Sequence, residues 1–572
     1  LSGMEGRMLI PLGIAFIVAL FASTVVALTL TPVLCSYMLT TKRALKKNEK
    51  EPFVSRSLKV WYKKALEWAL RHKKVVIGTS AVLLIFTIVI MTGLGRSFLP
   101  PFNEGSLTIN ISTMPGISLE ESDNMGRMAE KILLDIPEIQ TVARKTGRAE
   151  LDEHALGVNV SEMEAPFELD ERSRDEFLAD VRQRLGELKG VNIEIGQPIS
   201  HRIDAMLSGT KANIAIKLFG NDLNKLYNIG GQIKEAIQGI DGIADLTLEQ
   251  QIERPQLQIK PKRDMLAKYG IPLPEFSEFI NVALSGKVVS QVYEGGKVFD
   301  LTVKVHDDDK ANMEQIGNLM IDANGQKVPL HYVAEILPLV GPNTISRENV
   351  QRKIVVSANV AGRDLNGVVK DIQKTVGEQI TLPEGYHVEY GGQFESEQAA
   401  SRTLFLTSVI SILLIFLLLF NEFHSMPLSS IIMLNLPLAI IGGILSIWFT
   451  SGIISIPAII GFISLFGIAT RNGILLVSHY NHLRSEGMSL HDSVVLGSLD
   501  RLNPILMTAL TSALALIPLA VGGDLPGNEI QSPMAQVILG GLLSSTLLNG
   551  FVVPIMYLLL NHKQKEIENL EM

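Results

Sequence analysis

Cysteine, acidic residues within apolar segments, and nucleotide-binding motifs are rare or absent in this sequence. The 572 residues contain one cysteine, Cys35, which excludes a disulfide framework and a zinc site built from cysteines. No G-x-x-x-x-G-K-[ST] phosphate loop is present, which argues against an ATP-driven motor within this chain. The motifs H-E-x-x-H and G-x-S-x-G are missing as well, so the sequence gives no support to an enzyme.

Charged and aromatic side chains are sparse for a chain of this length. Charged residues make up 19% of the sequence and aromatic residues 6%, whereas hydrophobic residues make up 47%. This mixture is typical of a protein with membrane and aqueous parts, because a purely helical membrane protein carries fewer charges. The net charge of −8 argues against nucleic acid as a partner, since nucleic-acid binding requires basic surfaces.

Long apolar runs divide the chain into membrane and aqueous segments. A helix of roughly 20 apolar residues crosses the ~30 Å hydrocarbon core of a bilayer. The seven runs of about this length or longer are 9–38, 75–94, 404–420, 427–450, 455–480, 503–521 and 534–560. Lysine and arginine are concentrated between the first two runs, so the positive-inside rule places that loop in the cytoplasm. Alternation then places 95–400 outside the cytoplasm and the C-terminal tail inside.

The cytoplasmic loop itself contains a helical pattern. Apolar residues recur at helical spacing opposite a row of lysines; they are Leu58, Trp61, Tyr62, Ala65, Leu66, Trp68 and Ala69. This pattern predicts an amphipathic helix that lies flat in the membrane interface.

Arg471 lies near the middle of the apolar run 455–480. An arginine at that depth costs from ~3 to more than 10 kcal/mol unless it meets a partner or water. None of the other six runs contains an aspartate or glutamate, so we expect the counter-charge to come from outside this sequence. Either another subunit or a longer polypeptide supplies it, and a first residue of Leu1 rather than methionine favours the longer polypeptide.

Two polar residues near this cation have competing interpretations. Asn472 either bonds a neighbouring helix or takes part in coupling. Thr508 either relays a proton or bonds the carbonyl of the preceding helical turn.

The segment 95–400 alternates short strands with amphipathic helices. The patterns from 107 to 195 predict the order β-α-β-β-α-β, the split βαβ motif. A second copy begins near Asn213, is interrupted by an insert from about Pro255 to Val340, and resumes near Lys353. The sequence therefore predicts a duplicated, interrupted α+β domain.

Several stretches resemble the C-terminal half of a resistance-nodulation-division (RND) efflux pump of the heavy-metal branch, of the copper/silver or cobalt/zinc/cadmium type. The stretches are FLPPFNEGSLTINISTMPGIS, RKTGRAELDEHALG, HRIDAMLSG, RNGILLVSHY and RLNPILMTALTSALALIPLAVGG. The resemblance covers essentially the whole chain. It implies an α-helical membrane bundle with seven spans here, plus a periplasmic α+β porter domain of duplicated ferredoxin-like units with an inserted docking subdomain.

The resemblance also gives these segments names and expected boundaries. They are a transmembrane span at 1–40, a cytoplasmic linker helix at 41–74, a span at 75–95, the first porter subdomain at 96–211, the two parts of the second at 212–254 and 341–400, the docking insert at 255–340, a five-span block at 401–562 and a cytoplasmic tail at 563–572.

The family further implies a proton-driven homotrimer in a bacterial inner membrane. Its partners would be membrane lipid, a periplasmic membrane-fusion adaptor and an outer-membrane channel. The essential intramembrane acids of the family lie on a span of the half that this sequence lacks, and they would pair with Arg471. Arg471, Asn472 and Thr508 are then the expected proton-coupling residues. No bound cofactor is expected, only protons and the transported metal ion.

The resemblance suggests two sets of metal ligands. Met163 and Met206 match two of three methionines that bind soft Cu(I) or Ag(I) in the copper and silver pump, while Asn110 stands at the third position. A site that contains Glu162, Glu164, His201 or Asp204 suits Zn(II), Co(II) or Ni(II) better, because these ions accept imidazole and carboxylate. The alternative for both methionines is plain core packing. The run Asp152, Glu153 and His154 is either a ligand cluster or a solvated turn.

Two other functions fit parts of the pattern. An RND exporter of organic drugs or lipids is favoured by the cation and asparagine at 471 and 472, but the low aromatic content opposes a large aromatic pocket. A non-transporting accessory of protein export would share the membrane fold. It predicts a small outer domain with one repeat rather than two repeats and an insert.

Overall fold

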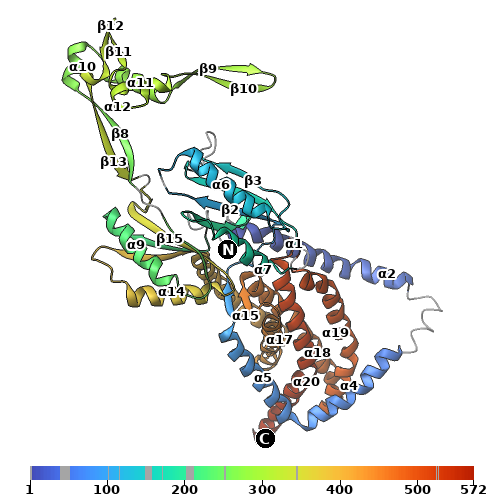
Figure 1. The fold of residues 1–572 in the computed structure, drawn as a ribbon. Coiled ribbons are helices and arrows are strands. Elements are labelled where there is room, and N and C mark those ends of the chain that lie inside the picture. The colour runs from blue at the N-terminus through green and yellow to red at the C-terminus, as the bar shows by residue number, and fades with distance from the viewer. Residues whose placement is uncertain are drawn as a thin grey trace. The chain divides into compact units, whose positions relative to one another are not determined.

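The computed structural model describes residues 3–38, 52–100, 102–114, 116–147, 157–169, 172–200, 212–249, 253–342, 345–523, 525 and 527–571 (Figure 1). The chain divides into two compact units. One consists of Leu1–Thr113, Glu120–Glu249 and Gln351–Met572, and the other of Met114–Leu119 and Gln250–Val350. The three candidate residues at 152–154 lie outside the described residues, as do His201, Asp204 and Met206.

Seven helical segments in the described part of the chain are long and apolar enough to cross a membrane, as the sequence predicts. They are formed by α1 (Gly3–Leu28) with α2 (Leu30–Met38), α5 (Lys73–Gly93), α15 (Gln393–Phe423), α16 (Met426–Met433) with α17 (Asn435–Phe449), α18 (Ile456–Ser485), α19 (Leu490–Val521) and α20 (Gln531–Glu571). The break between α16 and α17 at Leu434 precedes Pro437, which has no amide hydrogen for the carbonyl of Met433.

Helices α17, α18, α19 and α20 lie side by side (Figure 1). Gly442 of α17 and Gly540 of α20 allow the closest approach, because a Cβ atom on either glycine would collide with the carbonyl oxygen of the other. Ser544 on α20 strengthens this contact by donating a hydrogen bond of 2.8 Å to the carbonyl oxygen of Leu438. Small residues therefore fix the depth of α20 relative to α17.

Helix α4 (Phe53–Arg71) lies against α19 and α20. Its apolar face is buried, and the Tyr62 hydroxyl donates a 2.6 Å hydrogen bond to the carbonyl oxygen of Gly550. Leu58, Trp61 and Trp68, which the spacing also assigned to the apolar face, are exposed instead. The predicted amphipathic helix is thus present, with one face packed on the bundle.

The first sheet domain contains β2 (Ser106–Ser112), β3 (Ala143–Thr146), β4 (Val160–Pro166) and β5 (Asn192–Gly196), with helices α6 (Leu119–Leu134) and α7 (Arg174–Leu185). Its four strands are antiparallel in the order β3-β4-β2-β5. The apolar core lies between this sheet and the two helices, and includes Ile109, Leu133, Met163 and Phe177.

The second sheet domain contains β6 (Ile214–Phe219), β7 (Ile243–Leu248), β15 (Gln351–Val360) and β16 (His387–Gly392), with helices α9 (Leu223–Ile237) and α14 (Leu365–Gln379). Strands β7, β15, β6 and β16 are hydrogen-bonded in that order, each pair antiparallel, and the short strand β14 (Arg347–Glu348) also pairs with β15, so the sheet has five strands. The two sheet domains therefore share one order of strands along the chain and across the sheet.

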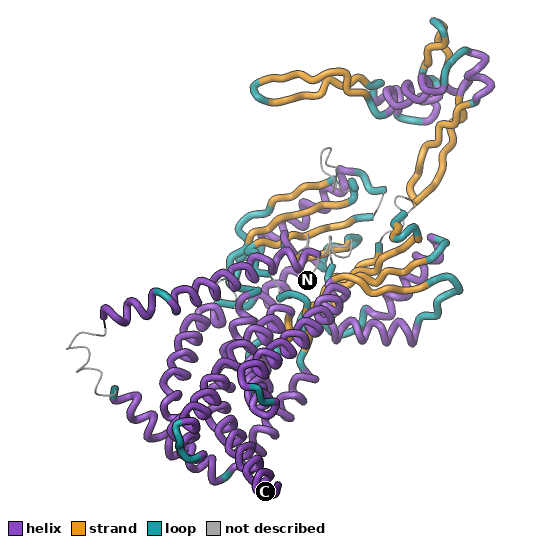
Figure 2. The backbone as a smooth tube through the Cα atoms, turned by 180° about the vertical axis from the view of Figure 1, so that it is seen from behind, coloured by secondary structure: helices purple, strands orange, loops and turns teal. Residues whose placement is uncertain are grey.

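The second compact unit is built on a long antiparallel ribbon of β8 (Glu253–Pro261) and β13 (Ala334–Pro342) (Figure 2). It further contains α10 (Arg263–Tyr269), α11 (Leu273–Leu284), α12 (Met313–Gly317), α13 (Leu330–Val333), β11 (Met320–Ala323) and β12 (Gln326–Pro329). A separate hairpin of β9 (Lys287–Glu294) and β10 (Lys297–Val303) is exposed at every residue, including Val292, Phe299 and Leu301.

Candidate functional site

The two sheet domains meet along β5 and β7. The guanidinium of Arg182 on α7 pairs with the carboxylate of Asp245 on β7, with nitrogen to oxygen distances of 3.2 and 3.3 Å. Asp245 also accepts a 2.9 Å hydrogen bond from the side chain of Asn359, which donates to the carbonyl oxygen of Ile195 at 3.3 Å. Asp245 has a φ of +51°, a left-handed conformation that is uncommon outside glycine and asparagine. The boundary is therefore closed by a specific polar network.

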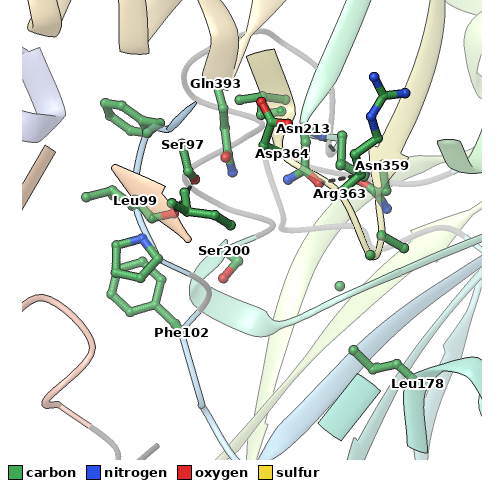
Figure 3. Close-up of a pocket in the computed structure, with 18 of the residues that line it drawn as sticks. Ser97, Leu99, Phe102, Leu178, Ser200, Asn213, Asn359, Arg363, Asp364 and Gln393 are labelled. Carbon is green, nitrogen blue, oxygen red and sulfur yellow. Dashed lines mark hydrogen bonds between the residues drawn. The ribbon is translucent and has the colours of Figure 1, made fainter. Parts of the chain in front are cut away.

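A cavity of about 690 Å³ lies beside this network, where both sheet domains approach the end of the helix bundle (Figure 3). The segment after α5 contributes Ser97, Phe98 and Leu99, and the segment before α18 contributes Gly452 and Ile453. On the opposite side, the backbone amide of Asn213 donates a 3.2 Å hydrogen bond to the side-chain oxygen of Asn359. The backbone amide of Val360 donates a hydrogen bond of the same length to the side-chain oxygen of Asn213.

The charges around the cavity do not suit a bare metal cation. Among the described residues, three arginines line it, Arg174, Arg182 and Arg363, against a single carboxylate, Asp364, and these lining residues include no methionine, histidine or cysteine. Asp364 accepts a 2.8 Å hydrogen bond from the amide of Gly367 and so caps the first turn of α14. Divalent and soft metals prefer anionic, imidazole or sulfur ligands, so the described lining of this cavity offers a metal only the carboxylate of Asp364.

Asp364 also packs on the strand that follows α5. Strand β1 (Gly95–Ser97) pairs in parallel with β17 (Ile453–Ser455), which leads directly into α18. A Cβ atom on Gly95 would meet the Cβ of Asp364 at 2.5 Å, so only glycine permits this contact. The second sheet domain is thereby attached to the segment that begins α18.

Met163 and Glu164 lie on opposite faces of β4. Met163 is fully buried in the apolar core of the first sheet domain, whereas Glu164 is exposed on the open face of the sheet. On that open face Asn110 of β2 pairs in register with Glu162 on one side and Glu194 on the other. The Met163 side chain is therefore enclosed in the apolar core, while carboxylate and amide side chains lie on the opposite face of the sheet.

A complete metal site is not present in the described part of the chain. Within those residues, no group of three or more histidine, cysteine, aspartate or glutamate side chains is arranged to hold a metal ion. Three of the five predicted metal ligands, His201, Asp204 and Met206, lie outside them. The prediction of a metal site stays a prediction.

Sequence reasoning did not find Glu104, which holds the backbone just before His201. Its carboxylate accepts hydrogen bonds from the amides of Ile199 at 2.6 Å and Ser200 at 3.0 Å. A glutamate that follows a Pro-Phe-Asn turn gave no sequence signal for this contact, because its partners lie about a hundred residues along the chain.

The residues predicted to couple protons differ in their surroundings. Arg471 is exposed on α18, and no carboxylate of the described residues lies within ion-pair distance of it. Asn472 is buried between helices, with 1% of its surface exposed. Thr508 donates a 2.9 Å hydrogen bond to the carbonyl oxygen of Ile505 in its own helix, which is the structural alternative for this residue. These geometries do not test the coupling role.

Seven helical segments of membrane length among the described residues, attached to two sheet domains, define the class of this chain as a multi-pass membrane protein. The chain belongs to the AcrB/AcrD/AcrF family, whose model matches residues 1–561.

Similar proteins confirm the resemblance to the heavy-metal branch of RND efflux pumps. The chain is 33% identical to the cobalt-zinc-cadmium resistance protein CzcA of Cupriavidus metallidurans, over 100% of this chain and 54% of that protein. It is 26% identical to the cation efflux system protein CusA of Escherichia coli, over 98% of this chain and 55% of that protein. A crystal structure of a heavy metal efflux pump superimposes with a TM-score of 0.76 and 27% identity, over 88% of this chain and 53% of that one. The chain spans about half the length of these relatives.

Proposed function

We propose that this chain is the C-terminal half of an inner-membrane pump that exports heavy-metal cations and is driven by protons. The similarity along the whole chain to metal resistance proteins carries this proposal. The exposed Arg471 supports it, because a cation at mid-membrane depth requires an anionic partner that a preceding half can supply.

The metal is proposed to be divalent. The relative named for cobalt, zinc and cadmium resistance is 33% identical and the one named for nickel and cobalt is 30% identical, against 26% for CusA. Asn110 in place of a third methionine weakens a thioether site, whereas Glu164 is exposed and available as an oxygen ligand. We assign Glu164, His201 and Asp204 as ligands, with Met163 and Met206 as the soft-metal alternative.

The proposed assembly is a homotrimer docked to a membrane-fusion adaptor and an outer-membrane channel. In it, 95–400 lies in the periplasm and its two sheet domains are copies of one ferredoxin-like unit. The exposed apolar residues of the β9–β10 hairpin support self-association, because such a surface is rarely left in water.

Two other functions receive less support. The relatives' names oppose export of organic drugs or lipids. Two sheet domains plus a separate compact unit oppose a protein-export accessory.

Metal tolerance tests the function. Cells that lack the pump and receive the complete protein should gain tolerance to Co(II), Zn(II), Cd(II) or Ni(II) but not to Cu or Ag. If tolerance changes for none of these metals, the proposal of metal export is wrong. If tolerance rises for Cu or Ag alone, the exported ion is a soft metal and Met163 and Met206 are the favoured ligands.

A further inference from the structure

Three asparagines are buried inside the helix bundle. Asn435 of α17, Asn472 of α18 and Asn549 of α20 have 0%, 1% and 2% of their surface exposed. A buried amide is costly in an apolar bundle unless its donors and acceptors are bonded, so each of these residues requires a partner.

The three asparagines lie in one layer of the bundle. Ile432, Leu476 and Val553 belong to a single apolar cluster, and one asparagine lies one helical turn from each of them. Asn435 follows Ile432 in the sequence, whereas Asn472 and Asn549 precede Leu476 and Val553. Because α17 runs antiparallel to α18 and α20 runs parallel to α18, all three asparagines lie on the same side of the apolar cluster. The contacts of Leu465 with Gly541 and of Tyr480 with Tyr557 show the parallel direction.

Contacts on the other side of the layer fix its depth. Ala439, Leu465 and Ala469 form a separate apolar cluster one to two turns away, and Gly541 packs against it. Between the two clusters, the Asn435 side chain donates a 3.4 Å hydrogen bond to the carbonyl oxygen of Ala469 and packs on Gly473. The asparagine layer is therefore bracketed by apolar residues above and below.

Five side-chain atoms of this layer have no hydrogen-bond partner among the described residues. They are the oxygen of Asn435 and both the oxygen and nitrogen of Asn472 and Asn549. Three acceptors and two amide donors thus lie buried at one depth of an apolar bundle.

The mixture of hydrogen-bond donors and acceptors determines which species can bind in this layer. A bare cation would use only the three oxygens and leave the amide hydrogens unbonded, and the sequences of α17, α18 and the spanning part of α20 contain no acidic residue to balance its charge. Water donates to the oxygens and accepts from the amides at the same time. The chemistry of the layer therefore matches water and not the exported metal.

We propose that Asn435, Asn472 and Asn549 form a buried water-binding site that belongs to the proton-coupling machinery. This inference rests on the proposed function. Arg471 precedes Asn472 in α18 and so lies at the same depth, on the exposed side of the helix. Bound water links the cation's helix to α17 and α20 through bonds that rearrange easily when α18 shifts, which a dry apolar layer does not provide.

The test uses the complete pump in liposomes with an imposed proton gradient. Asn435→Leu and Asn549→Leu keep the branched shape and the number of heavy atoms of the side chain but remove its polar atoms. We expect each to lower proton-driven metal transport at least tenfold, while metal binding is unchanged and the melting temperature is unchanged or higher. Asn549→Ser leaves room for water and should retain at least a third of the transport.

Ser545→Ala is the matched control. Ser545 lies one turn from Asn549 on α20, is also buried, and donates a 3.2 Å hydrogen bond to the carbonyl oxygen of Leu542 in its own helix. Its replacement should leave transport unchanged. Leucine variants that transport at the normal rate would show that the asparagines only fill space.

A second measurement is independent of transport. A cryo-EM map that resolves ordered water should show density within hydrogen-bonding distance of the three amides, and a dry layer in such a map would overturn the proposal. If the leucine variants fail to fold, the proposal is tested by the water density in this map and by the transport rate of Asn549→Ser. If the unsubstituted pump transports no metal although water is seen, the proposed function fails and the water site stands.

Discussion

Arg182 and Asp245 form an ion pair that joins the two sheet domains, with the carboxylate of Asp245 only 7% exposed. The pair lies beside the 690 Å³ cavity and fixes the width of the boundary between β5 and β7. Any change in the relative position of the two sheet domains during transport must alter this contact.

Removing the cation of this pair should loosen the boundary. Arg182→Met leaves a buried carboxylate that keeps only its bond from Asn359, and loss of a buried partner costs up to ~3–5 kcal/mol. Because Arg182 is 24% exposed, we expect a loss of about 1–3 kcal/mol in unfolding free energy. Thermal unfolding of the purified protein measures this.

Arg184→Met is the control for that experiment. Arg184 pairs with Asp180 on the same helix and is 40% exposed, so its loss should cost less than ~1 kcal/mol. Equal effects of the two variants would show that the Arg182 pair has no special role at the boundary.

The two faces of β4 make the choice of metal ligands testable. Met163→Ile preserves the apolar core and should change stability by less than ~1.5 kcal/mol, with divalent metal tolerance unchanged. Glu164→Gln removes an exposed oxygen ligand and should lower tolerance to Co(II) or Zn(II) several-fold. The reverse result, with tolerance lost in Met163→Ile alone, would assign the sulfur as a ligand.

Acid should destabilise the first sheet domain through Arg172. Its guanidinium bonds Glu138 at 2.6 Å and Asp180 at 2.9 Å, and these bonds lower the pKa of both carboxyl groups. The resulting stability is present above the carboxyl pKa values of the unfolded chain and is lost as pH falls through the lowered folded values. Melting temperatures between pH 7 and pH 3 should fall less steeply for Arg172→Gln than for the unsubstituted protein. Parallel curves would contradict this assignment.

The exposed hairpin should govern self-association. Phe299→Glu places a charge on β10 where the side chain is 51% exposed, so folding should be unaffected while the trimer of the complete pump dissociates. Lys297→Gln, an exposed polar change on the same strand, should leave the trimer intact. Mass photometry in detergent distinguishes the two, and a trimer that survives Phe299→Glu would exclude the hairpin from the interface.

The membrane helices could be predicted because length and composition alone identify an apolar span. The buried face of α4 followed from helical spacing as well, with Tyr62 and Leu66 packed on the bundle. The start of α19 could not be predicted from hydropathy. The helix begins at Leu490, and its polar first turns precede the apolar run that hydropathy detects.

Sites that depend on contacts between distant segments were beyond the sequence. The asparagine layer requires the relative depth of α17, α18 and α20, which Gly442, Gly540 and their neighbours set by close packing. The contact of Asp245 with Arg182 likewise joins residues 63 positions apart, and that of Glu104 with Ser200 joins residues about a hundred positions apart. Neighbouring residues of a strand, such as Met163 and Glu164, lie on opposite faces of a sheet, but only the positions of α6 and α7 determine which face is covered.

Proton-driven transport by the complete pump tests the central claim most directly. Arg471→Met removes the cation from its proposed acidic partner, so the ion pair that the transport cycle must form and break is lost and the cycle stops. Arg471→Lys keeps the charge without the planar guanidinium and should retain part of the activity. The measurement is uptake of Co(II) or Zn(II) into inverted vesicles under an imposed proton gradient, with metal binding to the purified protein measured in parallel. The account predicts lost uptake with binding retained in Arg471→Met, and full uptake by this variant would contradict it.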